Sequence, residues 1–239
     1  MNIALIGYGK MGHAIEQVAQ ARGHNIVLRI SSTNIGEMTS ENLQKADVAI
    51  EFTGPESAKH NVLAALSAGI SVVSGSTGWN SGLPDAAQRA KDHNVAFLHA
   101  SNFSVGVNIF FEVNKALASL MSRHIEYDVI IEETHHTQKK DAPSGTAITI
   151  AEQILENLGS KTKWALNDIN ESDALPILAY RVENVPGTHK VSYSSPVDSI
   201  EILHTAHNRD GFALGAVLAA EFLAGKQGVY TMKDVLFTA

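Results

Sequence analysis

The sequence contains no cysteine, and this absence excludes several kinds of chemistry. Without thiols the chain can form no disulfide framework, no thiolate nucleophile and no cysteine-ligated metal site. It also lacks an apolar run of about 18 residues, so a membrane-spanning helix is not expected. The first residues, MNIALIGYGKMG, contain no basic segment followed by a long apolar stretch, so a signal peptide is not expected either. These absences favour a cytoplasmic protein.

A surplus of basic residues is missing as well. The formal net charge is −7, from 18 lysines and arginines against 25 acidic residues, and the isoelectric point is near 5.8. Nucleic-acid-binding proteins are more often basic, so we expect neither a nucleic acid nor a membrane as partner. Acidic charge does not exclude small anionic ligands, because local groups bind those. The chain has 239 residues, 44% of them hydrophobic, which suits one large domain or two small ones.

Short apolar segments alternate with helix-like segments through the first half of the chain. The expected strands are 2–6, 26–30, 48–52, 70–74 and 95–99, and the expected helices are 11–21, 55–68 and 83–93. Short apolar strands joined by helices are typical of a parallel sheet that is covered on both faces. The sequence therefore predicts an α/β fold with a Rossmann doubly wound parallel sheet.

The pattern changes after about Phe103. The segments that follow are a helix over 105–122, a strand over 128–133, a helix over 144–158, an irregular stretch over 161–176, antiparallel strands over 178–183, 189–195 and 199–207, and a helix over 212–223. We expect a dinucleotide-binding domain over residues 1–103, with 209–239 returning to it. Residues 104–208 are expected to form a second α+β domain, with a mixed or antiparallel sheet, for substrate binding and oligomerisation.

A glycine-rich turn follows the first expected strand directly and opens the first helix. It reads Gly7-Tyr8-Gly9-Lys10-Met11-Gly12 and matches the GxGxxG pattern in the context that makes the pattern specific. Gly7 permits the tight turn, Gly9 lets the backbone approach a pyrophosphate, and Gly12 allows close packing of helix and strand. Free N–H groups at the helix start then face the phosphates. The alternative, a purely structural turn, explains less of the pattern.

The residues after the second strand bear on the choice of cofactor. A site selective for NAD usually has an acidic residue there for the ribose hydroxyl. This chain has Arg29-Ile30-Ser31-Ser32-Thr33-Asn34 instead, with no acid. A 2′-phosphate would meet the Ser31 hydroxyl and the Arg29 guanidinium rather than a carboxylate, although Arg29 pointing into solvent is an equal alternative. The sequence therefore favours NADPH, or the use of both NADPH and NADH.

Two more loops are expected at the carboxyl ends of parallel strands, where ligands bind in open α/β sheets. Both are built of small or polar residues that let a nicotinamide ring approach the backbone. Taken alone, either would more often be an ordinary loop. The candidate cofactor contacts in them are Gly75, Ser76 and Thr77 in the first loop, and Ala100, Ser101, Asn102 and Phe103 in the second.

The most unusual stretch places two histidines and two lysines between a strand and a helix. Lys139 or Lys140 would add positive charge beside the helix start at 144–146, whose free N–H groups favour an anion. His135 and His136 could donate a proton near neutral pH. A histidine pair can also bind a metal, but no third ligand is obvious, so no metal site is expected. A solvated basic loop is the other alternative, and only an anion site with an acid catalyst explains all of these residues together.

At this stretch the chain closely resembles the 4-hydroxy-tetrahydrodipicolinate reductase (dihydrodipicolinate reductase) family of bacterial lysine and diaminopimelate synthesis. The family signature E-x-H-H-x-x-K-x-D-A-P-S-G-T-A is filled at every fixed position from Glu133 to Ala147. The resemblance continues in Phe52-Thr53 with Pro55-Glu56, in Gly75–Gly78, in Asn102–Asn108 and in Val185-Pro186-Gly187-Thr188-His189. It spans nearly the whole chain in the right order.

The resemblance implies a role for each matching residue. His135 would be the catalytic proton donor and Lys139 its partner at the substrate. His136 would touch the substrate, while Gly145 and Thr146 would bind a substrate carboxylate through the helix start. The glycine turn and the two loops above would bind the cofactor, and the protein would be a homotetramer built through the sheet of its second domain.

The chain also departs in places from the pattern of the family that it resembles. It is somewhat shorter than many relatives, its glycine turn is one residue tighter, and the usual acid after the second strand is missing. The predicted activity is the NAD(P)H-dependent reduction of 4-hydroxy-tetrahydrodipicolinate, a small dicarboxylate. The alternatives are another Rossmann oxidoreductase with an amino-acid-like substrate, such as a homoserine-type dehydrogenase, and a non-catalytic nicotinamide sensor.

Overall fold

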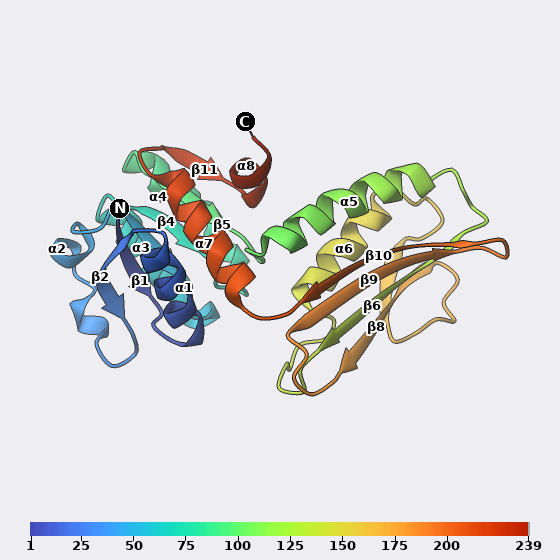
Figure 1. Cartoon of the computed structure of the whole chain (residues 1–239). Helices are drawn as coiled ribbons and strands as arrows, with labels where there is room; N and C mark the ends of the chain where they lie inside the picture. The colour runs from blue at the N-terminus through green and yellow to red at the C-terminus, as the bar shows by residue number, and fades with distance from the viewer. Residues whose placement is uncertain (239) are drawn as a thin grey trace. The chain divides into compact units, whose positions relative to one another are not determined.

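The structure, a computed structural model, describes residues 1–238. The described residues divide into two compact units, residues 1–105 with 209–238 and residues 106–208 (Figure 1). Among the described residues no helix is both long and apolar enough to cross a membrane.

The first unit is built on a six-stranded sheet in which every neighbouring pair of strands is parallel. The strand order is β11-β5-β4-β3-β1-β2. The strands are β1 (Asn2–Ile6), β2 (Asn25–Ile30), β3 (Val48–Glu51), β4 (Ser71–Ser74), β5 (Ala96–His99) and β11 (Gly228–Tyr230). The helices are α1 (Lys10–Ala21), α2 (Ser40–Leu43), α3 (Pro55–Ser67), α4 (Leu83–Asp92), α7 (Asp210–Leu223) and α8 (Met232–Phe237), with 3-10 turns at Ile35–Glu37 and Asn80–Gly82.

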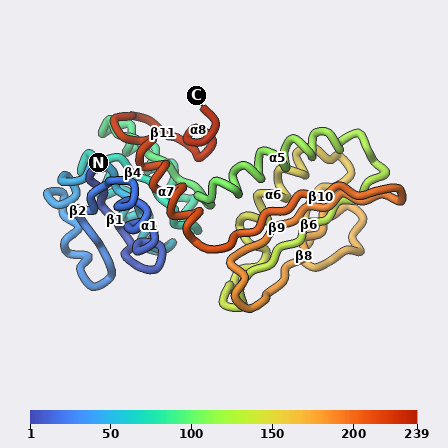
Figure 2. Tube along the Cα trace, viewed as in Figure 1, coloured from blue at the N-terminus to red at the C-terminus, as the bar shows by residue number. Residues whose placement is uncertain are grey.

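Successive side chains of a strand point to opposite faces of the sheet, and because most of them are apolar here, both faces are apolar. On β1, Ala4 and Ile6 pack into a core with α3 and α4, whereas Ile3 and Leu5 pack into a second core with α1 and α7. Helices therefore cover both faces, as a doubly wound sheet requires. In Figures 1 and 2 the late helix α7, drawn red, lies beside the early helix α1, drawn blue.

The second unit has a five-stranded mixed sheet in the order β10-β9-β6-β8-β7. Helices α5 (Val105–Met121) and α6 (Gly145–Leu155) cover one face, and their apolar side chains share a core with the sheet (Figure 1). The strands are β6 (Asp128–His135), β7 (Lys163–Leu166), β8 (Ala174–Arg181), β9 (Gly187–Ser194) and β10 (Ser199–Ala206). Both sheets confirm the predicted fold class.

Two details of the second unit differ from the sequence prediction. The stretch expected to be irregular contains β7 and the start of β8, and β8 pairs in parallel with both β6 and β7. The chain passes through α6 between β6 and β8, and a helical crossover of this kind permits parallel pairing. Only β9 and β10 form the expected antiparallel pairs.

Candidate active site

The glycine turn joins β1 to α1 with little room to spare. Gly7 has a φ of +102°, and a Cβ there would lie 2.0 Å from the carbonyl oxygen of Phe52. A Cβ on Gly12 would lie 2.4 Å from the oxygen of Gly7. Gly9 precedes the first residue of α1, and a Cβ built on it would meet no atom within 4 Å. The turn therefore packs closely against neighbouring backbone at Gly7 and Gly12 and leaves space at Gly9, before the helix start. This arrangement fits a bound pyrophosphate.

The other loops that the sequence predicts to bind the cofactor follow strands of the same parallel sheet, so they lie at one edge of it. Gly75 to Thr77 follow β4, Ala100 to Phe103 follow β5, and Ser31 follows β2. Thr77 and Ser101 are exposed, whereas Ser76 and Phe103 are buried. The sheet thus brings the predicted loops together, and the side chains of Ser76 and Phe103 pack inside the unit.

A carboxylate that the sequence analysis missed holds one of these loops, the one after β4, against the loop after β3. Glu51, the last residue of β3, is fully buried. Its Oε1 accepts hydrogen bonds from the Thr53 amide at 2.9 Å and from the Ser76 hydroxyl at 2.6 Å, and its Oε2 accepts one from Ser74 at 2.6 Å. An acidic residue at the end of an otherwise apolar strand was the available signal. This carboxylate ties the loop after β3 to the loop after β4.

Arg29 is engaged inside the protein rather than directed only at solvent. Its Nε lies 3.1 Å from Oε1 of Glu16 on α1, and its Nη2 also donates to that oxygen. The guanidinium lies 5.9 Å from the ring centre of Tyr8, whose hydroxyl donates to the same carboxylate. Donation from Arg29 holds the pKa of Glu16 below its usual range. The sequence did not reveal this pair, because Glu16 and Arg29 meet only through the packing of α1 on β2.

The second group of predicted residues lies between β6 and α6. His135 is the last residue of β6 and is buried, whereas His136 is partly buried. The Lys139 ammonium lies 2.8 Å from a carboxylate oxygen of Asp141. Helix α6 begins at Gly145, and a Cβ there would meet no atom within 4 Å. The loop therefore places a histidine, a lysine and an uncovered helix start in one short segment.

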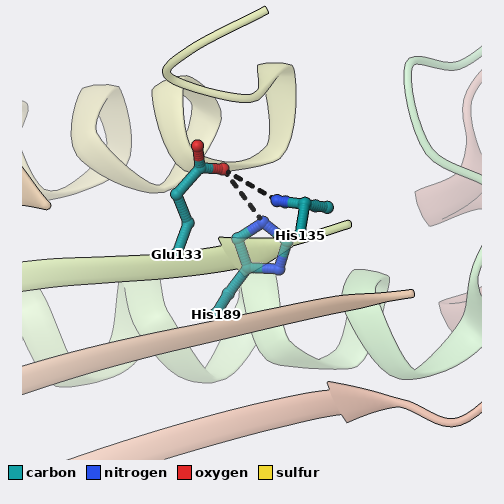
Figure 3. Close-up of side chains that lie close together, drawn as sticks. All are labelled: Glu133, His135 and His189. Carbon is teal, nitrogen blue, oxygen red and sulfur yellow. Dashed lines mark ion pairs between the residues drawn. The ribbon is translucent and has the colours of Figure 1, made fainter. Parts of the chain in front are cut away.

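Three buried side chains meet at the end of β6 (Figure 3). Glu133 and His135 both come from β6, and His189 comes from the neighbouring strand β9, where it pairs with Glu133. Oε2 of Glu133 lies 3.3 Å from Nδ1 of His135, outside hydrogen-bond alignment, and 3.9 Å from Nε2 of His189. A Cβ on Gly187 would lie 3.1 Å from Nε2 of His135, so the glycine leaves room for the ring.

Burial and charge set the protonation of two members of this cluster. Burial raises the pKa of Glu133, but the adjacent His135 and the donors of Ser144 outweigh it and hold that pKa at about 2. Burial, reinforced by the adjacent His135, lowers the pKa of His189 to about 3. At neutral pH the cluster therefore contains an anionic Glu133 and a neutral His189. The fixed negative charge of Glu133 lies 3.3 Å from Nδ1 of His135.

The same three residues have the ligand types of a zinc site, and their donor atoms lie within 4.8 Å of one another. However, both oxygens of Glu133 already accept a hydrogen bond from the Ser144 amide, at 3.1 Å. The guanidinium of Arg181 lies 3.2 Å from the carboxylate and would repel a cation. The arrangement suits acid–base chemistry better than metal binding, and the absence of a metal stays a prediction.

Family models match almost the whole chain. The model described as dihydrodipicolinate reductase, N-terminus, matches residues 1–103, and the one described as dihydrodipicolinate reductase, C-terminus, matches residues 106–236. A 4-hydroxy-tetrahydrodipicolinate reductase of Christiangramia forsetii is 50% identical over 99% of this chain and 98% of its own length. One of Methanoculleus marisnigri is 37% identical over 82% of this chain and 77% of its own length.

Solved structures agree with the fold. A dipicolinate-bound dihydrodipicolinate reductase from Paenisporosarcina superposes with a TM-score of 0.76 at 23% identity, covering 97% of each chain. An amine dehydrogenase from Mycobacterium smegmatis superposes with a TM-score of 0.65 at 11% identity, covering 97% of this chain and 95% of its own. The same two-part architecture therefore occurs in proteins of very different sequence.

Proposed function

Because this chain belongs to the dihydrodipicolinate reductase family, we propose that it reduces 4-hydroxy-tetrahydrodipicolinate to tetrahydrodipicolinate with NAD(P)H. This reaction belongs to the synthesis of diaminopimelate and lysine. The observation that carries the proposal is the segment from His135 to Gly145. It combines a buried histidine beside an anionic Glu133, a lysine, and a helix start with open space above it.

The proposed substrate carries two carboxylates, and the loop offers groups for one of them. Lys139 supplies a cation, and the start of α6 at Gly145 and Thr146 supplies the positive end of a helix dipole. His136 completes the proposed substrate contacts. The substrate carboxylate would replace Asp141 as the partner of Lys139, since Asp141 is exposed and its carboxylate lies 2.8 Å from the ammonium.

The nicotinamide cofactor, when bound, supplies the hydride. The net reaction takes up this hydride and one proton and releases water. His135, directly or through an ordered water, donates the proton, and the anionic Glu133 lies 3.3 Å from its Nδ1. General acid catalysis of this kind typically contributes about 10²–10⁴-fold in rate.

The first unit is the proposed dinucleotide-binding domain, and the second is the proposed substrate-binding and oligomerisation domain. The chain is proposed to use either nicotinamide cofactor, with a preference for NADPH. The proposed contacts of a 2′-phosphate are Arg29 and Ser31, at the end of β2, and no acid in the 31–34 stretch would repel it. The contacts between Arg29 and Glu16 set a limit on this preference, because the phosphate must compete with a carboxylate for the guanidinium.

A homotetramer in the cytoplasm is also proposed. The sheet face opposite α5 and α6 is open, and it carries Leu203, 62% exposed, and Tyr180, 45% exposed. Burying such side chains against another subunit would remove apolar area from water. Sedimentation of the purified chain tests the oligomer.

Substitutions in the loop test the proposed reaction. His135→Gln should lower kcat by about 10²–10⁴-fold, because the proton donor is lost. Lys139→Ala should lower kcat/KM by a similar factor, while Lys140→Ala, at the exposed neighbouring lysine, serves as the matched control. NADPH affinity should stay unchanged in all three variants, as measured by fluorescence titration. Wild-type turnover in both His135→Gln and Lys139→Ala would contradict the site assignment.

A further inference from the structure

The loop between β6 and α6 is held by one arginine from a neighbouring strand. Arg181 lies on β8 opposite His135 in the parallel pairing. Its Nη2 donates to the carbonyl oxygen of Asp141 at 2.6 Å, and its Nε donates to the carbonyl oxygen of Lys139 at 3.3 Å. These bonds fix the backbone of the loop. They therefore position Lys139 without contacting its ammonium group.

The same guanidinium is tied to the buried carboxylate of Glu133. Nη2 of Arg181 lies 3.2 Å from Oε1 of Glu133, and the Glu133 side chain is fully buried. Both oxygens of that carboxylate accept from the amide of Ser144, the residue that caps α6. One ion pair therefore holds the loop at three backbone positions: 139, 141 and 144.

We propose that Arg181 and Glu133 form a positioning pair that sets Lys139 and the start of α6 in the geometry that binds a dicarboxylate. The inference rests on the proposed function, because it assigns both groups to one carboxylate site. Neither residue needs to touch the ligand. Arg181 acts through two carbonyl oxygens of the loop, and Glu133 acts through the amide that precedes Gly145.

The shape of the guanidinium matters more here than its charge. Arg181 uses three nitrogens for four acceptors, since its Nη1 also donates to its own strand at the Tyr180 carbonyl, at 2.7 Å. A lysine ammonium at the same position keeps the charge but cannot span acceptors that a planar fork reaches. Arg181→Lys should therefore keep a cation beside Glu133 and release at least one end of the loop.

The experiment measures dipicolinate binding by calorimetry, together with KM, kcat and NADPH affinity. For Arg181→Lys we expect the Kd for dipicolinate and the KM for substrate to rise roughly 10-fold or more, since hydrogen bonds from the loop to a carboxylate weaken steeply when their alignment is lost. The change in kcat should be less than threefold and NADPH affinity should be unchanged. Arg123→Lys, at an exposed arginine of the same unit, is the matched control.

Glu133→Gln provides a second variant that keeps the size of the side chain. Because the two residues act as one unit, the double variant should weaken dipicolinate binding about as much as Arg181→Lys alone. If the increases in dipicolinate Kd from the two single variants multiplied in the double variant, the two residues would act independently, and the proposed pair would be wrong. Wild-type dipicolinate affinity in a folded Arg181→Lys protein, or a fall in kcat at unchanged KM, would also overturn it.

The outcomes separate this inference from the proposed function. A wild-type protein that binds dipicolinate but does not oxidise NADPH with the proposed substrate would contradict the function. The ratio of the dipicolinate Kd in Arg181→Lys to that in wild type would then still test whether the positioning pair exists. A wild-type protein with no affinity for dipicolinate would contradict both.

Discussion

His189 should make the folded protein sensitive to mild acid. Its side chain is 5% exposed, and Nε2 lies 3.2 Å from the Ser144 hydroxyl. Burial and the adjacent His135 lower the pKa of His189 to about 3 from an ordinary 6.5. The unfolded chain therefore binds a proton here at a pH where the folded chain does not. The stability that this difference provides is complete above pH 6.5 and is lost as the pH falls from 6.5 towards 3.

The size of the effect follows from the two pKa values. Between pH 7 and pH 5, a pKa of 6.5 in the unfolded chain and about 3 in the folded chain lowers the free energy of unfolding by about 2 kcal/mol. Over this interval the result depends almost entirely on the unfolded value, since the folded histidine stays neutral throughout.

Urea unfolding, followed by circular dichroism at one protein concentration, measures this loss. Wild type should lose about 2 kcal/mol more between pH 7 and pH 5 than His189→Gln does, because the amide does not titrate. For each protein, the free energy of unfolding at pH 5 is subtracted from its own value at pH 7. A destabilisation of the variant that is the same at both pH values therefore cancels. His93→Gln, at an exposed histidine, is the matched control. Equal losses in wild type and His189→Gln would refute the reasoning.

Three further predictions concern the first unit. Gly7→Ala should lower the thermal midpoint and abolish detectable NADPH binding in a fluorescence titration, because a Cβ would meet the Phe52 carbonyl at 2.0 Å and the φ is +102°. Glu16→Gln should raise the preference for NADPH over NADH by several fold in kcat/KM, because it releases Arg29; an unchanged ratio would count against phosphate recognition by Arg29. Glu51→Ala should weaken NADPH binding roughly 10-fold or more at unchanged dipicolinate affinity, since the carboxylate joins the loop after β3 to the predicted cofactor loop after β4; equal weakening of both ligands would contradict this role.

The parts of the fold that the sequence predicted are those with local causes. The turn from Gly7 to Gly12 and the short apolar strands each carry their signal within a few neighbouring residues. Strand β7 was missed because it is a short strand, at most half-buried, and the parallel direction of β8 depends on where α6 returns the chain. The direction of β8 relative to β6 is set by the packing of the whole unit, so no local sequence pattern indicates it.

The same limit applies to the candidate site. His135 and Lys139 are recognisable because they share one motif with the start of α6. Their supports are distant in the chain: Arg181 is 48 residues from Glu133, and His189 comes from another strand. An arginine in a strand or a glutamate before a histidine is too common to indicate such contacts, so only the folded sheet reveals them.

The most direct test is to supply the purified protein with NADPH and the aldol product of pyruvate and aspartate semialdehyde. We expect loss of NADPH absorbance in proportion to enzyme, formation of tetrahydrodipicolinate, and a rate at least about 10²-fold lower in His135→Gln. No consumption of NADPH or NADH by the folded wild-type protein would contradict the central claim that this chain is a reductase of that substrate.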